Sequence, residues 1–195
     1  MYEGIRLACQ KDAAAILDVY RPFITDTAIS FEYAVPSLTE FSARIRSIVS
    51  EYPYLVYEKK GRIEGYAYAH RYLERAAYQW DVEVTIYLSD AVRGTGVAAR
   101  LYNALEQLLQ QQGIINLYAC ITASNEASIK FHARAGYRLV GTFHHAGFKS
   151  GAWQDVVWME KTIGCYRDNP QPPQSFGGQD PEKVAALLKK FNEEE

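Results

Sequence analysis

Two hydrophobic patterns alternate along the chain. Short runs rich in β-branched and aromatic residues predict strands, because such residues suit a half-buried pleated surface. These runs occupy residues 5–8, 54–58, 63–70, 78–88, 114–121, 137–145 and 153–161. Segments in which apolar residues recur every three or four positions predict amphipathic helices. Five such helices begin near residues 12, 37, 97, 125 and 181.

Several element boundaries carry local signals. Asp12 predicts the N-cap of the first helix, and Ser37-Leu38-Thr39-Glu40 has the pattern of a capping box for the second. Arg21-Pro22 predicts a boundary or a kink of the first helix, because proline disfavours the helical conformation of the residue before it. Lys59-Lys60-Gly61-Arg62 separates two strands and predicts an antiparallel hairpin. Gly136 stands where a helix C-terminal glycine belongs.

The order of these elements predicts an α/β fold, called α+β in some schemes. A mixed central sheet flanked by helices is expected, antiparallel in its N-terminal part and parallel in the middle. We expect one domain over residues 1–162. Residues 163–179 are rich in Pro, Gln and Gly and predict a linker. Residues 180–195 predict an amphipathic helix that docks either on this domain or on a second subunit.

Composition and charge narrow the function classes. The 195 residues are 48% hydrophobic, which is enough for one sizeable core. The net charge of -2 comes from interspersed acids and bases, so no nucleic-acid partner is expected. The sequence has no signal-peptide pattern and no long apolar run, so we expect a soluble, cytoplasmic protein without a membrane partner. Cys9, Cys120 and Cys165 lack the spacing of a zinc site, so no metal is expected.

A glycine-containing loop between a strand and a helix is the first candidate ligand site. It reads Arg93-Gly94-Thr95-Gly96-Val97-Ala98. Glycines allow a ligand to approach the backbone, and the N–H groups of a first helical turn have no intrahelical partner. The loop therefore predicts a phosphate site. An ordinary strand-to-helix turn is the alternative.

Two phosphate ligands fit two different frames of this loop. Gly94-x-Gly96-x-x-Ala99 matches the dinucleotide pattern, which would make NAD the ligand. That site should open the first βα unit and precede an acid by about 20 residues, but roughly ninety residues come before it here. The strand over 114–121 contains no acid. The frame Arg93-x-x-Gly96-x-Ala98 resembles instead the pyrophosphate loop of the GNAT N-acetyltransferase family, which cradles the diphosphate of acetyl-CoA.

From residue 5 to about residue 158 the chain resembles the phosphinothricin acetyltransferase-like branch of the GNAT family. The matching segments occur in the same order as in that branch. They are Thr27-x-x-Ser30-Phe31, Tyr52-Pro53-Tyr54-Leu55-Val56, Gly65-Tyr66-Ala67-Tyr68-Ala69, Arg75-x-Ala77-Tyr78-x-Trp80-x-Val82-Glu83-x-Thr85-x-Tyr87, Asn125-x-x-Ser128, His132-x-x-x-Gly136-Tyr137, Gly147-Phe148-Lys149 and Trp153-x-Asp155-Val156.

The resemblance implies the GNAT fold, a homodimer and an activity. The activity is transfer of the acetyl group of acetyl-CoA to the α-amino group of a small amino acid, such as phosphinothricin, methionine sulfone or methionine sulfoximine. The residues that it implies for cofactor binding are Ile86, Tyr87, Leu88, Arg93, Gly94, Thr95, Gly96, Val97, Ala98, Asn125 and Ser128. Asn125 is equally suited to capping its helix, and both roles are compatible.

Glu83 is the candidate general base. An α-amino group with a pKa near 8 is mostly protonated at neutral pH, so a carboxylate helps to expose the lone pair. Glu83 lies in mid-strand between Val82 and Val84, where a carboxylate without a partner is unfavourable. The structural alternative is an ion pair between Glu83 and a base such as Arg75.

His132 is the second candidate catalytic residue. It falls where many GNAT enzymes carry a tyrosine general acid, four residues before Gly136. An imidazole titrates near neutrality and could protonate the leaving thiolate. A purely structural helix histidine is the alternative.

An amino-acid acceptor needs its own contacts. Its carboxylate calls for a cation, and Arg75 offers a bidentate guanidinium. The resemblance supports Arg75, Tyr78 and Phe31 as acceptor contacts and places Thr122 and Val156 beside them. Thr122 stands where phosphinothricin acetyltransferases can carry glycine, so its side chain could reshape the pocket. Plain packing or a subunit interface is the alternative for these aromatic residues.

Three other functions stay open at this point. The acceptor could be a polyamine or a protein N-terminus, although Arg75 favours a carboxylate-bearing acceptor. The protein could be a non-catalytic acyl-CoA-binding sensor. NAD binding is the last alternative, supported only by the glycine spacing.

Overall fold

The computed structural model describes residues 2–193. Seven strands form one mixed sheet in the order β1-β2-β3-β4-β5-β7-β6. The strands are β1 (Glu3–Leu7), β2 (Tyr54–Lys59), β3 (Arg62–Arg71), β4 (Asp81–Leu88), β5 (Asn116–Thr122), β6 (Arg138–Lys149) and β7 (Ala152–Thr162). β1 to β4 are antiparallel neighbours, and β4 and β5 form the parallel pair. This arrangement confirms the predicted α/β fold with a mixed sheet.

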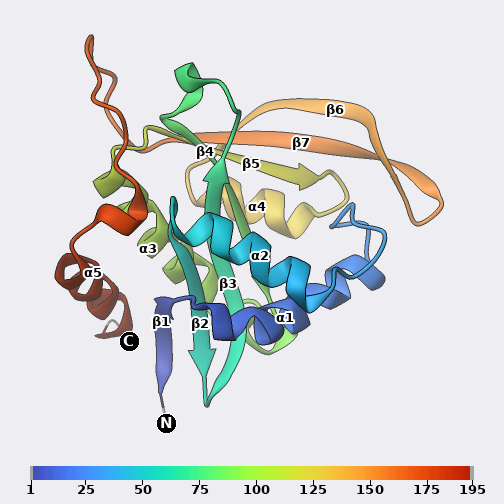
Figure 1. Cartoon of the computed structure of the whole chain (residues 1–195). Helices are drawn as coiled ribbons and strands as arrows, with labels where there is room; N and C mark the ends of the chain where they lie inside the picture. The colour runs from blue at the N-terminus through green and yellow to red at the C-terminus, as the bar shows by residue number, and fades with distance from the viewer. Residues whose placement is uncertain (1, 194–195) are drawn as a thin grey trace.

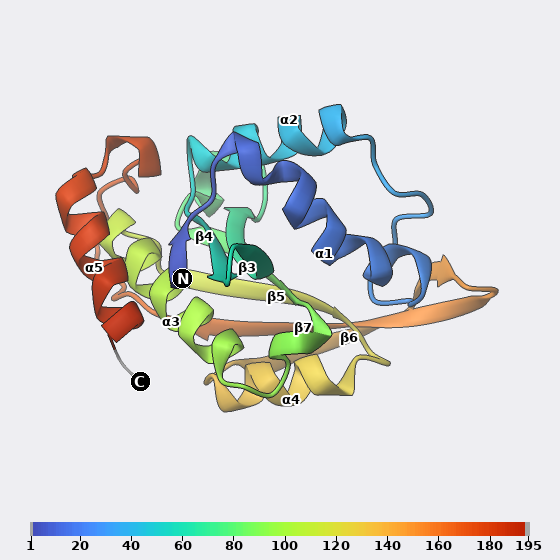
Figure 2. The same ribbon diagram turned by 90° about the horizontal axis from the view of Figure 1, so that it is seen from below.

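Helices cover both faces of the sheet, which gives three layers (Figures 1 and 2). The helices are α1 (Ala13–Thr25), α2 (Leu38–Val49), α3 (Val97–Gln112), α4 (Glu126–Arg134) and α5 (Pro181–Glu193). α1 and α2 lie over one face, and α3 and α4 lie over the other. α5 packs on this same domain, against β1 and α3.

The core has two parts, one on each face of the sheet. One cluster joins α3 and α5 to residues such as Leu101, Leu105 and Leu188, and the other joins α1 and α2 around Ile16, Phe23 and Ile45. The apolar stripes that predicted the helices are therefore the faces that they bury.

Several predicted boundaries are confirmed. Ser37 caps α2, since its hydroxyl accepts the backbone N–H of Glu40 at 3.2 Å. Lys60 and Gly61 both have positive φ (52° and 79°), which suits a two-residue hairpin turn between β2 and β3. Gly136, with φ of 92°, follows α4 as expected.

Of the boundary or kink predicted at Arg21-Pro22, the boundary is wrong. The helix continues through Pro22 to Thr25. The proline ring removes the donor to the Asp18 carbonyl, but the following residues Phe23 and Ile24 are buried against the sheet. Apolar burial there outweighs one missing hydrogen bond.

The predicted start of β4 at Tyr78 is also wrong. β4 begins at Asp81, and Ala76–Tyr78 form a short 3₁₀ turn. β3 ends at Arg71, so the residues just before β4 have no antiparallel partner. Strand propensity alone does not produce a strand without a ladder to join.

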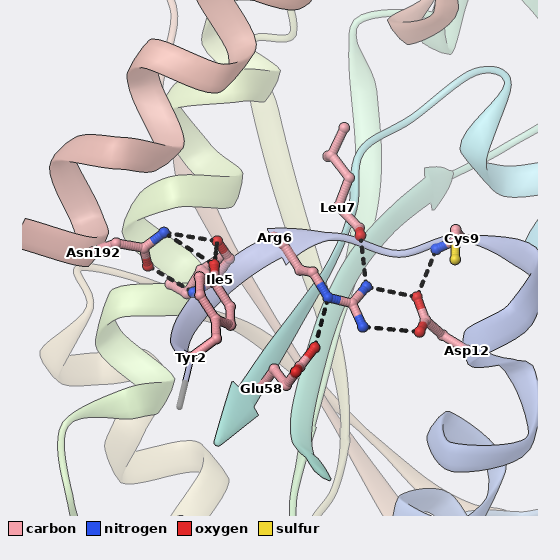
Figure 3. Close-up of polar contacts among 8 residues, drawn as sticks. All are labelled: Tyr2, Ile5, Arg6, Leu7, Cys9, Asp12, Glu58 and Asn192. Carbon is pink, nitrogen blue, oxygen red and sulfur yellow. Dashed lines mark hydrogen bonds and ion pairs between the residues drawn. The ribbon is translucent and has the colours of Figure 1, made fainter. Parts of the chain in front are cut away.

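Asp12 is the N-cap residue of α1, as predicted, but its side chain makes no capping hydrogen bond to that helix. Its carboxylate accepts the backbone N–H of Cys9 at 2.8 Å and two bonds from Arg6, at 2.7 and 2.9 Å (Figure 3). Arg6 also binds Glu58 of β2 at 2.8 Å. Asp12 therefore ties the start of α1 to the sheet.

Candidate active site

β4 and β5 separate part-way along their length. Their parallel pairing covers only Asp81↔Asn116, Val82↔Leu117 and Glu83↔Tyr118. Beyond Glu83, β4 stays paired with β3 as far as Leu88, while β5 stays paired with β7 as far as Thr122. The facing edges of β4 and β5 therefore diverge, and beyond Glu83 their backbone groups no longer pair with each other. A gap of this kind can accept an extended ligand by strand-like hydrogen bonding.

A cavity of about 740 Å³ lies at this gap. Its walls come from α1, α2 and the loop between them, from β2, β3, β4, β5 and β7, and from α3 and α4. Nine of the predicted site residues line it: Phe31, Glu83, Ile86, Tyr87, Thr122, Asn125, Ser128, His132 and Val156. Residues that are up to 125 positions apart in sequence thus line one cavity.

Glu83 is the last residue of β4 that pairs with β5. Its side chain is 23% exposed, and burial raises the pKa of the carboxyl above its ordinary value. The base that the structure pairs with Glu83 is His70 rather than Arg75. His70 Nε2 is 3.9 Å from Glu83 Oε2, and its charge lowers the pKa of Glu83 in opposition to burial. A raised carboxyl pKa moves Glu83 towards the range useful for proton transfer.

His132 lies deep in α4 with 2% of its surface exposed. Its Nδ1 is 2.8 Å from the carbonyl oxygen of Ser128, and its Nε2 is 2.9 Å from the hydroxyl of Tyr102. A carbonyl only accepts, so Nδ1 carries the hydrogen and Nε2 accepts from Tyr102. Burial lowers the pKa of His132, which keeps the ring neutral at pH 7.

The glycine loop connects β4 to α3. Gly94 and Gly96 have positive φ, 75° and 89°, and open space lies where a Cβ would stand at either. Gly96 is the N-cap of the 16-residue helix α3. The Arg93 guanidinium binds the Leu88 carbonyl at 3.3 Å and lies over the ring of Phe23. The loop is therefore an uncovered helix N-terminus with permissive backbone, which suits an anion.

Asn125 is the N-cap residue of α4, which follows β5. Its Oδ1 accepts the backbone N–H of Ser128 at 3.2 Å, which confirms the N-cap prediction. Both residues line the cavity. Their cofactor contacts stay a prediction.

The acceptor-side residues lie around the loop over residues 26–36. The Thr122 hydroxyl donates to the carbonyls of Ala28 and Ile29, at 3.1 and 3.2 Å. The Thr122 side chain therefore anchors this loop, while its effect on the shape of the pocket stays a prediction. Val156 pairs with Thr122 in the sheet.

Phe31 is held by a close approach to β6. A Cβ built at Gly147 would overlap the ring of Phe31. Lys149, which is buried, donates to the carbonyls of Ile24 at 2.9 Å and of Glu32. These contacts fix the end of α1 and the loop that carries Phe31.

Arg75 and Tyr78 are not among the described residues that line the cavity. Both are exposed and lie before β4, and Tyr78 packs edge-on against Tyr72. Leu88 and the loop residues Arg93 to Ala98 also lie outside the cavity wall, at the C-terminal end of β4. The acceptor role of Arg75 and Tyr78 stays a prediction.

Sequence reasoning missed two residues in the cavity. His70 stands directly opposite Glu83 in the β3–β4 ladder. Residues 72–80 connect the two strands without a two-residue turn, so the sequence did not fix the register that brings His70 opposite Glu83. Tyr102 looked like one more apolar position of a helix, and only the fold brings it to His132.

Two further observations concern other ligand classes. None of the helices within residues 2–193 is long and apolar enough to cross a bilayer. Over the same residues, no group of three or more His, Cys, Asp or Glu side chains is arranged to hold a metal ion.

Comparison with known proteins agrees with the geometry. The family model of the GNAT acetyltransferase domain matches residues 5–158. A phosphinothricin N-acetyltransferase of Streptomyces viridochromogenes is 32% identical over 170 residues, which cover 87% of this chain and 91% of that relative. An L-methionine sulfoximine/L-methionine sulfone acetyltransferase of Pseudomonas paraeruginosa is 30% identical, over 87% of this chain and all of the relative.

A solved structure shows the same arrangement. The phosphinothricin acetyltransferase of Sinorhizobium meliloti, in complex with acetyl-CoA, superposes with a TM-score of 0.81 at 31% identity, covering 93% of this chain and 97% of that one. The chain therefore belongs to the GNAT acetyltransferase family, in the branch that contains the phosphinothricin N-acetyltransferases.

Proposed function

We propose that this enzyme transfers the acetyl group of acetyl-CoA to the α-amino group of a small amino acid or analogue. Phosphinothricin, methionine sulfone and methionine sulfoximine are the acceptors suggested by its relatives. The observation that carries the proposal is the position of Glu83. A carboxylate with a raised pKa stands where β4 and β5 part, inside the cavity. An amine that enters there meets a base at the gap.

The residues of the glycine loop fit a diphosphate. Backbone N–H groups at the start of α3 and the positive end of its dipole attract anions, and Gly94 and Gly96 leave the approach open. Ile86, Tyr87 and Leu88 offer the free edge of β4 to the rest of the ligand, with Asn125 and Ser128 on the facing wall. Acetyl-CoA would supply an acetyl group activated as a thioester.

Glu83 then acts as the general base. It removes a proton from the acceptor ammonium, either directly or through water, and exposes the lone pair for attack on the thioester carbonyl. A backbone N–H of β4 near Ile86 to Leu88 would stabilise the negative charge that develops on the carbonyl oxygen.

His132 takes part in the protonation of the leaving thiolate. Because the ring is neutral and its Nε2 accepts from Tyr102, the donor on the cavity wall is the Tyr102 hydroxyl, with His132 behind it. We propose that the Tyr102 hydroxyl gives its proton to the leaving thiolate and that the Tyr102 oxygen then takes one of the two protons that the acceptor nitrogen loses. His132, whose Nε2 accepts the hydrogen bond from Tyr102, positions that hydroxyl.

The acceptor is held by Phe31, Thr122 and Val156 on the cavity wall, and we retain Arg75 and Tyr78 as its carboxylate contacts. We also propose a homodimer. Large apolar side chains on β6 and β7, including Phe143 and Trp153, are 60% and 61% exposed, which suits an interface. Three free cysteines suit a reducing, cytoplasmic location.

An acceptor panel tests the proposal. Release of free CoA would be measured with methionine sulfone, phosphinothricin, spermidine and an unblocked peptide. Methionine sulfone or phosphinothricin should be turned over best. Glu83→Gln should lower the rate by about 10²–10⁴-fold while CoA still binds. Turnover confined to spermidine or the peptide would change the acceptor class, and no turnover at all with CoA still bound would indicate a sensor. If NAD rather than CoA raises the melting temperature in a thermal-shift assay, acetyl-CoA is not the ligand of this site.

A further inference from the structure

His70 faces the proposed base and has no role in the chemistry described so far. It lies opposite Glu83 in the β3–β4 ladder, and both side chains line the cavity. His70 Nδ1 is 3.0 Å from the carbonyl oxygen of Arg71. Because a carbonyl only accepts, Nδ1 carries the hydrogen, and Nε2 is the nitrogen presented to Glu83 at 3.9 Å.

The reaction releases a proton that must leave the cavity. An ammonium and a thioester give an amide, a thiol and one proton. The acceptor nitrogen loses two protons in all: one ends on the thiol, and the other has to reach bulk water. Glu83 is 23% exposed and His70 is 36% exposed, so the imidazole is the group nearer to solvent.

We propose that Glu83 and His70 act as one proton-holding pair, in which His70 takes the acceptor's proton from Glu83 and passes it to solvent. This inference rests on the proposed function. In the transfer the O–H bond of Glu83 breaks and an N–H bond forms at His70 Nε2, which restores the carboxylate. The imidazolium then loses its proton to water. A separation of 3.9 Å requires a bridging water or a small rotation of the ring. His70 acts through Glu83 and is thus a positioning residue.

The other groups around the pair do not compete for this proton. Burial raises the pKa of Tyr68 on β3, of Tyr102 on α3 and of Tyr72 after β3, and raises that of Cys120 on β5 to about 12, so all four stay neutral near pH 7. Across the cavity, Glu32 and Arg44 pair with each other at 2.7 Å.

The pH profile of kcat/KM tests the pair. For His70→Gln with methionine sulfone, we expect a loss of about tenfold at neutral pH. This is less than the loss of about 10²–10⁴-fold expected for removal of the base itself, because Glu83 can still lose its proton directly to water. The acid limb should move to higher pH, because Glu83 loses the positive neighbour that lowers its pKa. Added imidazole buffer should restore part of the rate, while CoA affinity should not change. His144→Gln is the matched control: this histidine is 71% exposed, pairs with Asp155 and does not line the cavity.

A second measurement does not depend on activity. The side-chain carboxyl carbon resonance of Glu83 would be followed by NMR from pH 4 to 9 in the wild type and in His70→Gln, with Glu83→Gln used for assignment. The midpoint of the Glu83 curve should lie at higher pH in His70→Gln, because Glu83 loses the neighbour that lowers its pKa. Identical curves in the two proteins would overturn the inference.

The outcomes separate the two proposals. Suppose that the wild type transfers acetyl groups and Glu83→Gln does not. If His70→Gln then keeps the wild-type pH profile and its rate does not rise with imidazole, the proton-holding pair is wrong and the proposed function stands. If the wild type acetylates no acceptor in the panel, the proposed function is wrong. The transfer of a proton from Glu83 through His70 to solvent is then wrong as well.

Discussion

The side-chain amide of Asn192 binds both backbone groups of Ile5. Its Oδ1 accepts the Ile5 N–H at 2.6 Å, and its Nδ2 donates to the Ile5 carbonyl at 2.9 Å (Figure 3). β1 is an edge strand, whose outer N–H and C=O groups would otherwise face solvent or another chain. One amide from α5 therefore stands in for a neighbouring strand and holds the C-terminal helix to the sheet.

Asn192→Ala should destabilise the fold without altering catalysis. Two hydrogen bonds to partly buried backbone groups are lost, which corresponds to about 1–3 kcal/mol in the free energy of unfolding. Urea unfolding measures this loss. Asn103→Ala on the exposed side of α3 is the matched control and should change the stability by less than about 0.5 kcal/mol. Equal stabilities of the two variants would contradict the role of Asn192.

Glu83→Gln should stabilise the fold at neutral pH. Burial raises the folded-state pKa of this carboxyl above its ordinary value of 4.5, so the folded protein favours the protonated form. The contribution of Glu83 to stability is full below pH 4.5 and is lost as the pH rises through the folded pKa. The advantage of Gln over Glu should therefore grow from about pH 4.5 upwards and level off above the folded pKa.

Unfolding free energies of the wild type and Glu83→Gln between pH 4 and 8 would test this. Glu126→Gln, on an exposed ion pair with Lys130, controls for the loss of one surface carboxylate. If the stability difference between the wild type and Glu83→Gln does not vary with pH, burial does not raise the pKa of Glu83.

Gly96→Ala should weaken CoA binding. Gly96 has φ of 89°, and a methyl group there would both strain the backbone by about 1–2 kcal/mol and intrude on the approach to the α3 N-terminus. We expect a loss of CoA affinity of about tenfold or more by calorimetry.

Gly61→Ala separates strain from ligand contact. Gly61 also has positive φ (79°) and open space around it, but it lies in the β2–β3 turn. It should lose similar stability and keep full CoA affinity. Equal CoA affinities of the two variants would contradict a phosphate site at the loop.

Gly147→Ala should affect the acceptor rather than CoA. The added methyl group would displace the ring of Phe31, so KM for the acceptor should rise by about three- to tenfold, as expected for a side chain moved by an ångström. Gly141 lies in the same strand with open space at its Cβ position, and Gly141→Ala should leave KM unchanged. Steady-state kinetics with methionine sulfone distinguish the two. An unchanged KM in Gly147→Ala would remove Phe31 from the acceptor site.

Local signals in the sequence were sufficient to predict most of the helices and strands. Period-two and helical patterns located the strands and helices, and the caps at Ser37 and Asn125 appear as predicted because a cap needs only residues three positions away. The positive φ of Gly94 and Gly96 was likewise a matter of local backbone chemistry. The errors arose where burial overrode propensity, as in α1 beyond Pro22.

Sequence alone determined that a glycine loop opens a helix and that a carboxylate lies in the strand before it. Only the tertiary structure decided what surrounds that carboxylate. The divergence of β4 from β5, the approach of His70 and the contact between Tyr102 and His132 all join segments distant in sequence. Which strands pair, and where they stop pairing, depends on how the whole core packs, and no local pattern encodes that choice.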